Sequence, residues 1–168
     1  MENHIVGSTH LLGIDIMTLL DLIKANYKSL DDSNHQDIED YLHIIGKPID
    51  AIIYSCIFCP ELIELNDSIL LQYNLRTEEV KQRFASFSNS NKCKPELEKS
   101  FNLIEIPYLF SDLQNFSDDE IVALAEIIQM SWSAWLKFKY PGRIFVVKTY
   151  QANEETGETV SITFWEEP

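Results

Sequence analysis

A capping signal followed by apolar residues at helical spacing, between residues 116 and 141, constrains the fold of this chain most strongly. The Ser117 hydroxyl can accept a hydrogen bond from the first helical turn, and Glu120 can reach back to the Ser117 N–H. Phe116 and Ile121 stand at the two positions of a hydrophobic staple. These features predict a helix of ~22 residues, roughly 33 Å long, which is about the width of a small domain.

The apolar residues of this predicted helix recur at intervals of three and four. Its main face consists of Ile121, Leu124, Ala125, Ile128, Trp132, Trp135 and Leu136. A second, narrower apolar stripe lies beside this face and gives the helix a wide apolar arc. We therefore expect other elements to pack on more than one side of the helix. Pro141 and Gly142 end the pattern. We predict a core helix, and the alternative is that the wide arc forms an interface in a larger assembly.

The remainder of the chain alternates between helical and strand-like patterns. Helices are expected at residues 14–30, 35–45 and 77–87. Strands are expected at residues 49–58, 62–65, 69–73, 101–106, 143–150 and 159–165. For residues 49–58 the β-branched composition and the length favour a strand over a helix.

Two turns and one polar segment organise these elements. Asn66 and Asp67 tolerate the left-handed conformation of a tight turn, which predicts a hairpin, and residues 151–158 predict a second one. Residues 88–100 are polar and are expected to be a linker and a possible subdomain junction. We predict a single α+β domain, residues 1–168. Its mostly antiparallel sheet would be built from two hairpins plus additional strands, packed against the long helix of the C-terminal half and shorter N-terminal helices.

The charge of the chain narrows the range of partners. Its 168 residues include 27 acidic and 13 basic side chains, a formal net charge of −14. This balance argues against nucleic acids and anionic membranes, which require a basic face, and permits a basic protein partner. No signal peptide or apolar run of membrane-spanning length is visible, and three cysteines suit a reducing compartment, so a cytoplasmic location is expected. The oligomeric state is not predicted.

Cys56 and Cys59 form the sharpest chemical motif, a C-x-x-C pair. Such a pair can be a redox dithiol or half of a zinc site. On a strand, residues three apart would point to opposite faces, and Cys93 and the histidines lack the spacing of further zinc ligands. We therefore expect buried structural thiols, no cofactor and no metal. The alternative is a thiol- or metal-dependent enzyme, or a redox protein, centred on Cys56 and Cys59.

The predicted binding surface lies near the C-terminus, around a tryptophan on the polar face of the last strand. Its residues are Trp165, Glu154, Glu155, Glu158, Glu166 and Glu167. An exposed tryptophan among acids can anchor a basic partner. No nucleophile, phosphate-loop or metalloprotease motif is present, which favours a non-enzymatic function. We therefore predict an acidic protein-interaction domain that neutralises or regulates a basic partner. Toxin-neutralising immunity proteins share this size and acidity, an analogy of class only.

Overall fold

A computed structural model describes residues 10–11, 14–15, 21–23, 38–89, 93–110 and 117–168. The chain divides into two compact units, residues 1–51 and 52–168. In the first unit, β1 (His10–Leu11) pairs antiparallel with β2 (Ile14–Asp15), and α2 (Ile38–Ile45) is followed by Gly46.

Of the predicted N-terminal helices, the second is confirmed as α2 over its described part. The first, residues 14–30, is wrong at its start, because residues 14–15 pair as a strand, although residues 21–23 are helical. Residues 16–20, 24–30 and 35–37 of these predictions lie outside the described residues.

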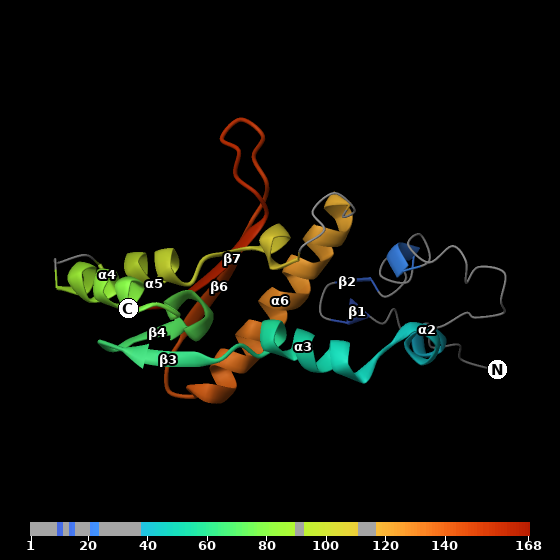
Figure 1. The fold of residues 1–168 in the computed structure, drawn as a ribbon, viewed down its shortest axis with the longest axis horizontal. Coiled ribbons are helices and arrows are strands. Elements are labelled where there is room, and N and C mark those ends of the chain that lie inside the picture. The colour runs from blue at the N-terminus through green and yellow to red at the C-terminus, as the bar shows by residue number, and fades with distance from the viewer. Residues whose placement is uncertain (1–9, 12–13, 16–20, 24–37, 90–92, 111–116) are drawn as a thin grey trace, which may run out of the picture. The chain divides into compact units, whose positions relative to one another are not determined.

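The second unit has an α+β architecture with antiparallel strands and one long helix, as predicted. After α3 (Pro48–Phe58), which leads into this unit, come β3 (Leu62–Leu65), β4 (Ser68–Leu71), η2 (Gln72–Leu75), α4 (Glu78–Ser88), α5 (Lys94–Phe101), β5 (Ile104–Glu105), η3 (Ile106–Leu109), α6 (Asp118–Lys139), β6 (Phe145–Tyr150) and β7 (Ser161–Glu166). β3 and β4 form one hairpin sheet, and a separate three-stranded sheet has the order β5-β7-β6 (Figure 1).

The long helix α6 forms as its capping box predicts. Glu120 N–H donates to Ser117 Oγ at 3.3 Å, and Ser117 N–H donates to Glu120 Oε2 at 2.7 Å. The expected staple residue Phe116 lies outside the described residues. The buried face of α6 consists of Ala125, Ile128, Trp132 and Leu136. Its second apolar stripe is less covered, and Phe138 is 74% exposed within the described structure.

This face of α6 packs on one side of the three-stranded sheet. The side consists of the alternating residues Val160, Ile162 and Phe164 at and beside β7, all of them buried in the same core cluster as the α6 residues. The rings of Trp132 and Phe164 meet edge to face with centroids 5.8 Å apart. Since successive side chains of a strand point to opposite faces, Ser161, Thr163 and Trp165 face the other way.

The β3–β4 hairpin also forms as predicted. Asn66 and Asp67 have φ values of 50° and 64°, the left-handed conformation that a two-residue hairpin turn requires. Leu62 pairs with Leu71, and all four residues of β4 are buried. The predicted helix at residues 77–87 is confirmed as α4, whose Thr77 side chain accepts a hydrogen bond from Val80 N–H.

The prediction of a strand at residues 49–58 is wrong, because these residues form α3. Pro48 occupies the first helical position, where the missing N–H is not needed, and Ala51 N–H donates to Lys47 O at 3.3 Å. At the other end, Ser131 Oγ and Trp132 Nε1 of α6 donate to the carbonyls of Phe58 and Ile57 at 2.5 and 2.8 Å. These contacts satisfy carbonyls that a helix terminus leaves unpaired, so tertiary packing overrides the strand preference.

The linker expected at residues 88–100 is also wrong in its second half, which forms α5. This helix packs on the face of β7 opposite α6, so the sheet is covered on both sides. The strand expected at residues 101–106 shrinks to β5, and Pro107 follows in the short helix η3. In the described part of the chain, none of the helices is long and apolar enough to cross a membrane.

Candidate functional site

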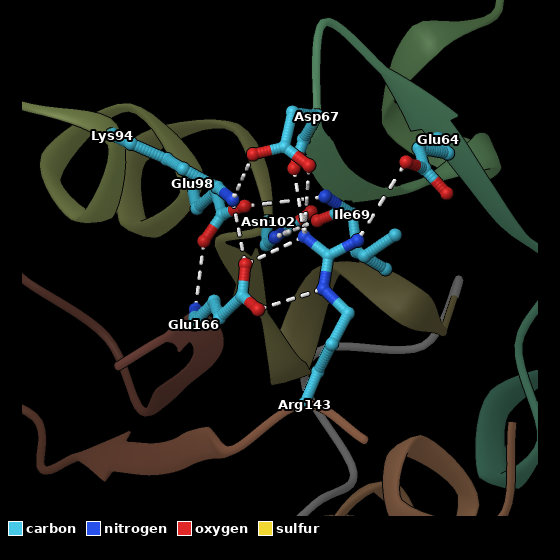
Figure 2. A network of polar contacts seen from close by, with 8 residues as sticks. All are labelled: Glu64, Asp67, Ile69, Lys94, Glu98, Asn102, Arg143 and Glu166. Atoms are coloured by element: carbon cyan, nitrogen blue, oxygen red, sulfur yellow. Dashed lines mark hydrogen bonds and ion pairs between the residues drawn. The ribbon is translucent and has the colours of Figure 1, made fainter. Parts of the chain in front are cut away.

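Two buried polar side chains of α5 and its C-terminal cap join the two sheets. Asn102 Oδ1 accepts a hydrogen bond from Leu71 N–H at 2.9 Å, and Asn102 Nδ2 donates to Ile69 O and Phe164 O at 2.9 and 3.2 Å. The side chain is fully buried. Asn102 therefore connects β4 to β7, which do not pair as strands, by hydrogen bonding to both backbones. Figure 2 shows its contact with Ile69 of β4.

Glu98, one turn earlier on α5, makes a similar connection. Its carboxylate accepts hydrogen bonds from Ile69 N–H at 3.2 Å and from Glu166 N–H at 2.7 Å (Figure 2). Burial raises the pKa of Glu98, although both backbone donors and nearby Lys94 act in the opposite direction. A buried carboxylate is tolerated here because each of its oxygens has a donor.

Glu166, predicted to be part of the binding surface, lies in an ion-pair cluster (Figure 2). Arg143 Nε donates to Glu166 Oε1 at 2.7 Å, and Lys94 Nζ lies 2.6 Å from Glu166 Oε2. The hydrogen bond from Arg143 lowers the pKa of Glu166. The same cluster reaches the β3–β4 turn, where Lys94 Nζ lies 3.0 Å from Asp67 Oδ2. Glu166 thus holds three chain segments together, and only 17% of its side chain is exposed.

Trp165 and Glu167 are the sequence neighbours of Glu166 on either side. Trp165 is half-buried, and Lys99 Nζ of α5 lies 4.5 Å from the centroid of its ring. The strand face that the sequence analysis expected to be open is covered by α5, since Thr163 is buried and donates to Lys99 O at 2.8 Å. Glu167 is exposed beyond the end of the strand.

The glutamates Glu154, Glu155 and Glu158 form a separate group, which we name the acidic turn. All three are exposed in the loop that joins β6 and β7, and this loop projects away from α4, α5 and the β3–β4 hairpin (Figure 1). Trp165 follows Glu158 by seven residues of extended chain, roughly 23 Å. The predicted site residues are therefore divided between the two ends of the hairpin.

The acidic turn has a defined backbone. Asn153 pairs with Glu158 as an isolated antiparallel bridge, and Asn153 Oδ1 accepts a hydrogen bond from Glu155 N–H at 3.0 Å. Thr156 Oγ1 donates to Glu158 Oε2 at 3.0 Å. Gly157 has φ = 72°, a conformation that favours glycine. These local bonds order the backbone that carries the carboxylates.

A pocket of 350 Å³ lies at the base of the acidic turn, between α5 and the three-stranded sheet. Its lining includes Glu105, Glu158 and Tyr150, together with the ion pair of Lys99 and Glu96. Thr159 Oγ1 donates to Glu105 Oε1 at 3.3 Å. No sequence pattern indicates Glu105, which precedes the turn by about fifty residues and belongs to no motif. Only the pairing of β5 with β7 brings Glu105 to the pocket.

The prediction for Cys56 and Cys59 needs correction. Both thiols are exposed and unpaired, not buried. Because α3 is a helix, residues three apart lie on one face rather than on opposite faces. The pair lies at the C-terminal end of α3, whereas the reactive cysteine of thiol oxidoreductases stands at a helix N-terminus. Among the described residues, no group of three or more His, Cys, Asp or Glu could hold a metal ion.

Comparison with known proteins adds no relative to this description. No protein-family model matches the chain, and the searches of curated proteins and of solved structures likewise found no significant match.

Proposed function

We propose that the protein is a non-enzymatic interaction domain that binds a basic protein through the acidic turn, and so neutralises or regulates that partner. The observation that carries this proposal is the geometry of Glu154, Glu155 and Glu158, which are exposed together on a turn whose backbone is held by its own hydrogen bonds. A loop that is ordered before binding loses less conformational entropy when it binds.

The charge of the chain supports the same partner. A net charge of −14 attracts a basic protein over long range and raises the rate of encounter. Contacts at the acidic turn would then set the orientation of the complex. A cytoplasmic location is part of the proposal, supported by three cysteines that are all unpaired.

The pocket at the base of the turn offers a place for one basic side chain of the partner. Glu105 and Glu158 can accept hydrogen bonds from a guanidinium or ammonium group, and the Tyr150 ring can pack on it. A lysine or arginine inserted there would be partly desolvated, which is how interface hot spots gain binding energy.

A thiol-dependent function remains the second candidate, favoured by two exposed thiols, Cys56 and Cys59, that line the same concave region at the end of α3. Stoichiometric zinc in the purified protein, or an activity lost when both cysteines are replaced by alanine, would support this candidate. Purified protein without zinc and an unchanged double variant would exclude it.

The interaction proposal is tested by affinity capture from native lysate with three baits. These are the wild-type chain, the triple variant Glu154→Gln/Glu155→Gln/Glu158→Gln, and a matched control with Glu61, Glu79 and Glu126 replaced by Gln. The control removes the same charge from exposed residues on other elements. We expect a basic protein to be recovered near stoichiometry with wild type and control at low salt, and to be lost with the triple variant or at high salt.

The proposal fails if the triple variant and the wild type recover the same proteins in the same amounts. It also fails if the control loses the partner as completely as the triple variant does. That outcome would mean that total charge, rather than the acidic turn, determines binding.

A further inference from the structure

A second concave region lies on a different part of the second unit, where α3, β3, η2 and α6 meet. It has a volume of 630 Å³. Its lining combines both thiols with aromatic and cationic side chains, among them Cys56, Cys59, Tyr73, Arg76, Trp135 and Lys139. None of these residues belongs to the acidic turn or to the polar network around Glu166.

The cations of this region are unusual for so acidic a chain, because neither has an acidic partner in the part of the chain that the structure describes. The Arg76 guanidinium lies 3.9 Å from the centroid of the Tyr73 ring, and Lys139 Nζ lies 4.7 Å from that of Trp135. Among the described residues, no carboxylate is within ion-pair distance of Arg76 or Lys139, although Glu61 is also part of the lining. Within the described structure, both side chains can therefore receive an anion.

An apolar pocket of 270 Å³ adjoins this region. The two share Cys56, Pro60, Tyr73 and Arg76 as lining residues. The rest of the apolar pocket is formed largely by aliphatic and aromatic side chains, including Ile53, Ile57, Leu109 and Trp132. A molecule that occupies both pockets would thus contact cations at one end and apolar surface at the other.

The walls of both pockets are held by α6. Trp135 Nε1 donates to Pro60 O at 2.9 Å, next to the hydrogen bonds of Ser131 and Trp132 to the end of α3. The Trp132 side chain belongs to the main core cluster, and its ring meets Phe164. The pockets are therefore built on a helix that is anchored in the main core cluster, and a rigid support of this kind is typical of ligand sites.

We propose that these adjoining pockets bind an amphipathic organic anion, a carboxylate with an apolar tail. The carboxylate lies between Arg76 and Lys139, and the tail lies among Ile53, Ile57 and Leu109. A cationic mouth beside an apolar pocket matches both halves of such a molecule, because the carboxylate gains charge-assisted hydrogen bonds and the tail leaves water.

Calorimetric titration of the full chain with decanoate, below its micelle concentration, tests the proposal. We expect saturable one-to-one binding, weakened about ten- to hundredfold by Arg76→Gln or by Lys139→Gln. Lys137→Gln is the matched control, since Lys137 is exposed on the same helix and is not part of the lining. The Lys137→Gln protein should bind decanoate with the affinity of the wild type. Decanol, which has the tail without the charge, should bind more weakly than decanoate.

The thiols of Cys56 and Cys59 provide an independent test of where decanoate binds. In a Cys93→Ala protein, only Cys56 and Cys59 remain, and saturating decanoate should slow their reaction with a thiol reagent. Three results would each overturn the proposal: a dissociation constant weaker than about 1 mM, equal affinities in the Arg76, Lys139 and Lys137 variants, or thiol reaction rates that decanoate leaves unchanged.

Discussion

At the scale of single residues, the acidic side chains of the second unit divide into two groups with different physical roles. Glu98 and Glu166 have donors on both carboxylate oxygens and lie inside the fold, while the glutamates of the acidic turn face solvent. Neighbouring residues can belong to different groups, as Glu166 and Glu167 do. The position of an acid in the sequence therefore does not indicate whether it can meet a partner.

Glu166→Gln is expected to lower the free energy of unfolding by about 2 kcal/mol at neutral pH, because Arg143 and Lys94 lose their charged partner. The pKa of Glu166 is lowered from its usual value of 4.5 in the folded protein. Its contribution is therefore complete above that value and is lost as the pH falls through the lowered pKa. Urea unfolding at a series of pH values should show the two proteins converging in acid.

The exposed neighbour Glu167 supplies the control, since Glu167→Gln should change stability by less than about 0.5 kcal/mol. An equal loss in both variants would contradict the assigned role of Glu166. So would a difference between Glu166→Gln and wild type that stays constant in acid.

At the scale of elements, α5 is the helix that joins the two sheets, and it does so through side-chain hydrogen bonds to backbone. Asn102→Ala leaves Leu71 N–H, Ile69 O and Phe164 O without their partner. We expect a loss of about 3 kcal/mol or more in the free energy of unfolding. The control Asn89→Ala, at the exposed end of α4, should be nearly neutral. Similar unfolding midpoints for the two variants would show that the hydrogen bonds of Asn102 contribute little to stability.

The capping box at the N-terminus of α6 predicts a smaller loss of stability, from a single hydrogen bond. Ser117→Ala removes the side-chain acceptor of Glu120 N–H and should cost about 1 kcal/mol. On the same helix, Ser133 Oγ donates only to Gln129 O of the preceding turn and is exposed. Ser133→Ala should therefore be neutral or slightly stabilising, since alanine favours helix. Thermal unfolding that ranks the two variants in the opposite order would contradict the capping role.

The elements that the sequence predicts correctly are those with local signals. The capping box of α6, the left-handed Asn66-Asp67 turn and the Thr77 cap each depend on residues within one turn of one another. By contrast, α3 and α5 depend on contacts distant in sequence. The α3 carbonyls are satisfied by α6, and α5 buries Glu98, which sequence patterns assign to solvent.

The candidate site, too, can be predicted only where its residues are close together in sequence. The acidic turn could be predicted because its glutamates are close together in sequence, whereas the pocket beside it needs Glu105 from β5. The alternation of Trp165 with Thr and Ser on the polar face of its strand predicts an exposed ring, but Lys99 of α5 lies over that ring. Residues 88–100 were predicted to be a linker, so the helix α5 that covers this face of β7 was not expected.

At the scale of the whole molecule, the buried side chains of both core clusters lie between residues 69 and 164, within the second unit. Trp132, Trp135 and Trp165 are the only tryptophans of the chain. Tryptophan fluorescence of the full chain therefore reports on the second unit alone, while far-ultraviolet circular dichroism reports on both.

We expect a fragment of residues 47–168 to fold without the first unit, because it retains both core clusters and the Lys47 carbonyl at the start of α3. Its urea unfolding, followed by tryptophan fluorescence, should be cooperative, with a midpoint close to that of the full chain. A fragment lacking residues 47–58 is the control. It should be less stable, because Ser131 and Trp132 then lose their acceptors at the end of α3. A broad, non-cooperative transition for the 47–168 fragment would show that residues 1–46 are needed to stabilise the second unit.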